Sequence, residues 1–126
     1  MSILSNLKTL KPVASAPAKV EMTDEQVKEM RQKLRDQNRM NVQPNKFDKA
    51  KPFRVAAKIK GTNEWKTHGY FTNVDVASAV GTLVSAAQFG DKAMRGEYDE
   101  SVVENHAEYL AWLEDERNAS IVAALS

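Results

Sequence analysis

Apolar and polar side chains alternate most clearly over residues 53–60, which read FRVAAKIK. Every second residue from Phe53 is apolar, and the positions between carry Arg, Ala or Lys, which is the pattern of a half-buried β-strand. Turn residues at 61–63 lead into a return strand over residues 64–71. The stretch therefore predicts a β-hairpin with one basic face.

A helix with a basic surface is predicted ahead of the hairpin, from Thr23 to about Asn38. Thr23 can cap this helix, and Gln26, three residues later, can close a capping box. Residues 41–52 are rich in Asn, Pro, Lys and Asp. They predict a loop that contains a short first strand near residues 45–49.

Two further helices are predicted after the hairpin. The first begins at Thr72 or Asn73, is rich in alanine and ends just before Gly90, because glycine readily takes the positive φ found at helix ends. The second is expected to open at Ser101, with Glu104 closing a capping box, and to carry an acidic outer surface.

Together these elements predict an α+β fold, in which a small two- or three-stranded antiparallel sheet packs on one α-helix, flanked by an N-terminal and a C-terminal helix. A chain of 126 residues is long enough for one such core and too short for two. The expected organisation is a flexible arm (1–21), a basic helix (22–40), a sheet-plus-helix unit (41–98) and an acidic helical segment (99–126).

The net charge of +1 conceals a division along the chain. Residues 1–70 hold 15 Lys and Arg against 7 Asp and Glu, a charge of +8. Residues 71–126 hold 3 against 10, a charge of −7. Such asymmetry points to a surface that binds a polyanion, paired with an acidic tail or partner surface.

Composition argues against several classes of function. The chain has no cysteine, so it forms no disulfide or thiolate metal site, and its two histidines lack metal-ligand spacing with carboxylates. We find no glycine-rich phosphate loop and no nucleophile motif, so we expect no enzyme, no metal and no cofactor. With no apolar run of about 18 residues and no charged-then-apolar leader, we expect no membrane association and a cytoplasmic location.

The second strand ends in Gly69-Tyr70-Phe71, and the alanine-rich helix that follows ends in Phe89-Gly90. In the order of these elements, a basic strand, a turn, a second strand and an alanine-rich helix, residues 47–93 resemble the DNA-binding domain of the APETALA or ethylene-response-factor type and its phage and mobile-element relatives. The chain departs from the family pattern at residues 67, 68 and 81. The resemblance implies a non-enzymatic protein that binds double-stranded DNA, plausibly encoded by a phage and acting in the host cytoplasm.

It also implies that the exposed sheet face enters the major groove, which admits a ribbon of strands. Arg54 is the candidate for a bidentate contact with guanine, since Lys is a point charge better suited to phosphate. An ordinary solvated sheet face would show the same polar pattern. The candidate contacts are Arg54, Lys58, Lys60, Trp65 and Thr67 on the strands, with Lys46, Lys49 and Lys51 ahead of them as phosphate contacts.

A protein-interaction role is the alternative prediction. The arm and the C-terminal helix, through Tyr109, Trp112 and Leu113, would then dock on a host or phage protein or on a second copy of the chain. Such a virion-associated factor could also present its acidic surface as an imitation of nucleic acid. The same apolar stripe would also suit packing on the core of the domain itself.

Overall fold

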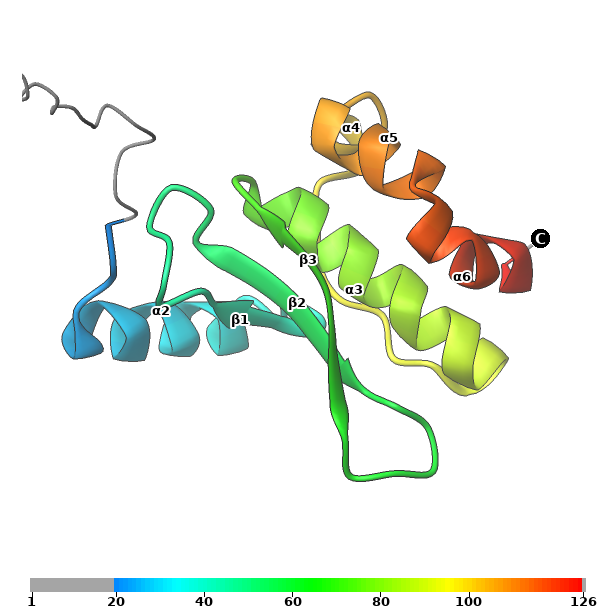
Figure 1. Ribbon diagram of the computed structural model, residues 1–126, viewed down its shortest axis with the longest axis horizontal. Helices are drawn as coiled ribbons and strands as arrows, with labels where there is room; N and C mark the ends of the chain where they lie inside the picture. Colours follow the sequence, from blue (N-terminus) through cyan, green and yellow to red (C-terminus); the bar gives the residue numbers. More distant parts are fainter. Residues whose placement is uncertain (1–19, 126) are drawn as a thin grey trace, which may run out of the picture.

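A computed structural model of the chain describes residues 20–125, and Figure 1 shows a three-stranded antiparallel sheet with helices packed beside it. This confirms the α+β fold class. The predicted arm lies outside the described residues, apart from Val20 and Glu21. The elements are α2 (Asp24–Asp36), β1 (Val42–Pro44), β2 (Phe53–Lys58), β3 (Trp65–Phe71), α3 (Val74–Phe89), η1 (Gly90–Lys92), α4 (Glu100–Val103), α5 (Ala107–Glu114), η2 (Glu116–Asn118) and α6 (Ala119–Ala124).

Local sequence signals fix the ends of the two long helices. Thr23 and Gln26 form the predicted capping box of α2, with hydrogen bonds of 3.0 and 3.1 Å between each side chain and the other's backbone N–H. Asn73 caps α3 by accepting two backbone N–H groups of the first turn. Gly90 ends α3 with a φ of 58°.

The first strand lies at Val42–Pro44, so its predicted position near residues 45–49 was wrong. Asn45 ends the strand, because its backbone N–H donates to the Pro52 carbonyl at 2.8 Å and its side chain to the Lys51 carbonyl at 2.9 Å. These bonds fold residues 45–51 into a loop. Pro44 fits here because β1 is an edge strand.

One extra residue interrupts the pairing of β2 with β3. Ala56 stands opposite Thr67, whereas Val55 stands opposite Gly69, which leaves His68 without a partner on β2. A β-bulge of this kind shifts the alternation of the strand by one residue. Before His68, the odd-numbered residues of β3 lie on the face turned away from α3. After His68, the even-numbered residues lie on that face.

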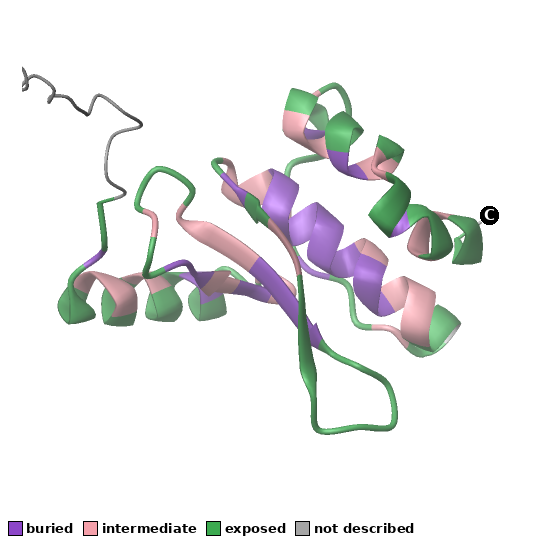
Figure 2. Cartoon of the chain, viewed as in Figure 1, coloured by how far each residue is buried: buried purple, intermediate pink, exposed green. Residues whose placement is uncertain are grey.

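The hydrophobic core is centred on α3, which packs against the middle of β2. Figure 2 shows the buried residues running along α3 and into β2. Val55, Val76, Val80 and Val84 are each no more than 1% exposed. A helix that packs only on a sheet buries one apolar stripe, whereas α3 is buried on nearly every side because other segments cover the faces that the sheet leaves free.

Residues 38–41 cover one of these faces. The Asn41 side chain donates to the Gly81 carbonyl at 2.9 Å, and the Met40 backbone N–H donates to Ser78 Oγ at 3.3 Å. A Cβ atom on Gly81 would overlap the Met40 carbonyl oxygen. Glycine in the middle of this helix is therefore required by the close approach of another backbone segment.

A helix was predicted to open at Ser101 and to run as far as a break at Asn118; its start and its continuity were wrong. Asp99 caps α4 instead, accepting from both the backbone and the hydroxyl of Ser101. His106 Nδ1 accepts from the Glu108 backbone N–H and begins α5, and Asp115 ends it. Side chains that bond to nearby backbone compete with a continuous helix, so the segment folds into short helices that pack on α3 (Figure 1).

Candidate nucleic-acid interface

The sheet face turned away from α3 gathers four of the predicted contacts. Val55 and Ala57 belong to the core cluster, so the residues that alternate with them on β2 point to the other side. Cross-strand partners share a face, which extends this side onto β1 and β3. We call this surface the open face; its residues are Gln43, Arg54, Ala56, Lys58, Trp65, Thr67 and Tyr70, of which Ala56 is covered by its neighbours.

Lys58 and Trp65 stand opposite each other where the hairpin leaves the body of the sheet. The Lys58 ammonium lies 5.9 Å from the centroid of the Trp65 ring, and Trp65 is 56% exposed. Gln88, near the end of α3, holds this end of the hairpin. Its side chain donates to the Lys58 carbonyl at 3.0 Å and accepts the Lys60 backbone N–H at 2.7 Å.

Arg54 lies in the middle of the open face, between Gln43 and Tyr70. Its Nη2 donates to Gln43 Oε1 at 2.7 Å, and its Nε is buried without a hydrogen-bond partner. A bidentate contact with guanine would have to share the guanidinium with Gln43. Arg54 therefore offers a weaker fork for base recognition than the sequence implied.

Lys60 does not lie on the open face, contrary to its predicted place there. The strand ends at Lys58, so the alternation stops before Lys60. Its ammonium instead lies 5.8 Å from the ring centroid of Phe89, the last residue of α3, on the helix side of the sheet.

The three lysines of the preceding loop are exposed but point to different surroundings. Lys46 forms an ion pair with Asp24 at 3.4 Å. Lys49 lines a groove between α2 and the start of β2, beside Phe53. Of the three, Lys51 borders the hollow next to the open face.

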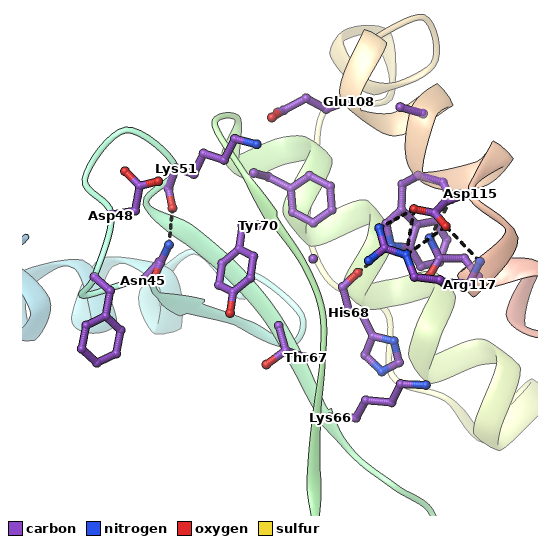
Figure 3. A pocket seen from close by; sticks show the side chains of 16 residues that line it. Asn45, Asp48, Lys51, Lys66, Thr67, His68, Tyr70, Glu108, Asp115 and Arg117 are labelled. Atoms are coloured by element: carbon purple, nitrogen blue, oxygen red, sulfur yellow. Dashed lines mark hydrogen bonds and ion pairs between the residues drawn. The ribbon is translucent and has the colours of Figure 1, made fainter. Parts of the chain in front are cut away.

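This hollow has a volume of about 1190 Å³ and crosses β3 between the 45–51 loop and α5. Figure 3 shows Tyr70 and Thr67 on the side toward the loop, and Asp115 and Arg117 on the side toward the C-terminal helices. Both walls carry both signs of charge. The loop side holds Lys51 and Asp48 beside Phe47, Thr67 and Tyr70. The α5 side holds Arg117 and Lys66 together with Glu108 and Asp115.

The carboxylates on the α5 side are already bonded. Glu108 accepts from the Thr72 backbone N–H at 3.0 Å and from its hydroxyl at 2.8 Å. Arg117 donates to Asp115, with Nη2 to Oδ2 at 2.7 Å, and these bonds lower the pKa of the Asp115 carboxyl to about 2. The ion pair with Arg117 offsets the charge of Asp115 on this side of the hollow.

The residues predicted to bind a protein partner pack on the core instead. Trp112 is 6% exposed, and its Nε1 donates to the His68 carbonyl at 2.8 Å. Tyr109 and Leu113 are half-buried against the same core cluster. Trp112 thus anchors α5 to the sheet, and its burial leaves little of its surface for a partner protein.

Three residues of the candidate site were not predicted. Tyr70 and Gln43 belong to the open face, and Phe47, which is 68% exposed, lines the hollow beside it. Gly69 was the available signal for Tyr70, because a glycine inside a strand often marks a bulge. With the bulge at His68, Tyr70 joins the side of Trp65; without it, the two would lie on opposite faces.

Within residues 20–125, no three acidic or histidine side chains are arranged to hold a metal ion. No helix in the same range is long and apolar enough to cross a membrane. A scan of protein-family models and searches of curated proteins and of solved structures gave no match to this chain. The function must therefore be argued from the site alone.

Proposed function

We propose that this chain is a non-enzymatic nucleic-acid-binding protein and that the open face is its contact surface. The observation that carries the proposal is the combination of Lys58 and Arg54 with exposed Trp65 and Tyr70 on one uncovered side of the sheet. Basic groups neutralise phosphates, and aromatic rings contact bases.

The distribution of charge supports this proposal. The C-terminal segment, whose acidic residues lie in and around α4 and α5, packs on α3, which covers the other face of the sheet. Lys58 is exposed on the open face, and Lys51 is exposed beside it. A polyanion approaching the open face would therefore meet the basic half of the chain first.

The APETALA-type resemblance names duplex DNA as the ligand, and a sheet of three strands backed by one helix agrees with the architecture that it implies. An origin in a phage or mobile element and a place in the host cytoplasm belong to the same proposal. The fold by itself does not decide among kinds of nucleic acid.

A salt titration tests the proposal. We expect the affinity of the full chain for nucleic acid to fall linearly with salt on logarithmic axes, as counterions are released. Lys58→Ala should lower the affinity and reduce the slope by about one. Lys92→Ala, which removes an exposed lysine from η1, is the matched control. Failure to bind any nucleic acid at low salt would exclude the proposal.

The protein-interaction alternative has less support in the structure. It depended on the apolar residues of the C-terminal helix, which pack on the core. The N-terminal arm, its second component, lies outside the described residues. A specific complex with a partner protein, together with no affinity for nucleic acid, would restore this alternative.

A further inference from the structure

Three aromatic side chains on or beside the open face are exposed to solvent over about half of their surface or more. Trp65 is 56% exposed, Tyr70 is 47% exposed, and Phe47, which lines the same hollow as Tyr70, is 68% exposed. Phe71, the next residue along the chain, is 3% exposed. Apolar surface left in water costs about 25 cal/mol per Å². Several exposed rings on one side of the sheet, with basic groups beside them, therefore favour a ligand that covers them.

These rings are ordered along β3. Phe47 and Tyr70 lie at the end of the strand near the 45–51 loop, and Trp65 lies at the hairpin end, with Thr67 between them. At about 3.3 Å per residue, Tyr70 and Trp65 are separated by roughly 15 Å along the strand. A flexible chain that follows β3 can therefore reach both rings.

Aromatic side chains bind nucleic acid chiefly by stacking on the faces of bases, and a duplex keeps those faces covered by neighbouring bases. Reading a duplex through the major groove instead requires donors directed at the edges of paired bases. Arg54 is the best donor on the open face, yet its Nη2 is bonded to Gln43 and its Nε is buried. The exposed groups of this face are thus better suited to base faces than to base edges.

The positions of the lysines indicate where the phosphates of a bound strand would lie. Lys58 lies beside the Trp65 ring, and Lys51 borders the hollow near the 45–51 loop. Lys66 alternates with Trp65 and Thr67 and points to the α5 side of β3. A strand stacked on the aromatic rings would therefore have Lys58 and Lys51 as its nearest phosphate contacts.

We infer that the open face binds unpaired bases of single-stranded nucleic acid, which stack on Trp65 and Tyr70 with Phe47 as a third contact, in preference to duplex. This inference rests on the proposed function and narrows its ligand class. Single-stranded DNA and RNA share the required chemistry, an unpaired base on a phosphate backbone.

The test is a fluorescence anisotropy titration of the full chain against labelled oligo(dT), oligo(rU) and a duplex, each about 12 nucleotides long. At the same salt concentration, we expect a single strand to bind at least about tenfold more tightly than the duplex. Trp65→Ala and Tyr70→Ala should each weaken this binding about 5- to 100-fold, whereas Trp65→Phe should retain most of it.

Phe89→Ala is the matched control, because Phe89 is a 46% exposed aromatic residue outside the open face. It should leave the affinity unchanged, and circular dichroism should show that every variant is folded. If oligo(dT) or oligo(rU) binds more tightly than the duplex, the inference is supported. The tighter of the two single strands then identifies the preferred backbone. Duplex binding as tight as single-strand binding overturns the inference and leaves the proposed function standing. No binding in any arm overturns both.

Discussion

The two tryptophans of this chain lie on opposite sides of the same strand and have opposite environments. Trp65 belongs to β3 itself, faces away from α3 and is 56% exposed. Trp112 approaches β3 from α5, is 6% exposed and bonds to the His68 carbonyl through its indole N–H. The side of the sheet that a tryptophan meets decides whether it stabilises the fold or remains available to a ligand.

The regions around the two residues differ in charge as well. Lys58 stands opposite Trp65 on the open face, whereas Trp112 shares its helix with Glu108 and is followed by Asp115. Lys66 and Arg117 lie on the side of Trp112, so the division of charge between the two sides of β3 is partial. Removing each side chain in turn tests whether the two sides are as separate in energy as they are in space.

The largest effect is expected for Trp112→Ala. It removes a buried ring and the hydrogen bond to His68, so the free energy of unfolding should fall by about 3–5 kcal/mol, as for other large core truncations. Chemical denaturation measures the change. Trp112→Phe, which keeps a ring but loses the hydrogen bond, should cost less. A loss below about 1 kcal/mol for Trp112→Ala would show that α5 is not held by this residue.

Glu108→Ala should have the next largest effect. It removes the carboxylate that accepts the backbone N–H and hydroxyl of Thr72 and joins α5 to the start of α3. The free energy of unfolding should fall by about 1–2 kcal/mol. Glu104→Ala, a change of an exposed glutamate after α4, is the control and should change it by under about 0.5 kcal/mol. Equal losses for the two variants would contradict a specific role for the Thr72 bonds.

A smaller effect should appear in the pH dependence of stability at His68, where the two sides meet. Partial burial, helped by the nearby charge of Lys66, lowers the pKa of His68 below 6.5. As the pH falls through this region, the unfolded chain binds the proton first, so the free energy of unfolding should decrease. The decrease ends below the lowered pKa. His68→Gln should flatten the denaturation midpoints between about pH 7 and 5; an unchanged slope would contradict this assignment.

The smallest effect on stability is expected for Trp65→Ala. Its ring is largely in solvent, so the free energy of unfolding should change by no more than about 0.5 kcal/mol. Fluorescence gives a second measurement. The Trp65→Phe variant keeps only the buried Trp112, and the Trp112→Phe variant keeps only the exposed Trp65. The first variant should therefore emit at the shorter wavelength. Matching emission maxima would mean that the two environments are alike.

The sequence predicted those parts of the fold that depend on nearby residues. Thr23 and Gln26 identified the start of α2, and the alternation from Phe53 identified β2, because caps and strand faces are local properties. The close approach of Met40 to Gly81 was not predictable, since it joins segments far apart in the chain. The breaks in the C-terminal segment depend on competing caps at Asp99 and His106, whose outcome is set by packing.

For the candidate site, the alternation of side chains along β2 predicted that Arg54 and Lys58 lie on the same face of the sheet, and the structure has them there. The same rule failed for Lys60 because the strand ends two residues earlier. Tyr70 was missed because its face depends on the bulge, and pairing between strands decides where a bulge forms. Binding by the open face stays a prediction.

Because β3 contains one extra residue, the length of this strand matters more than the identity of residue 68 in deciding which side chains of β3 face outward. Removing His68 would turn Trp65 and Thr67 toward α3 and bring Lys66 to the outer side in their place, although every remaining letter of the sequence was kept. A single substitution at position 68 would leave that arrangement intact. Variants of this protein should therefore tolerate many side chains at this point but not a deletion, because the number of residues between Thr67 and Gly69 decides which side chains form the open face.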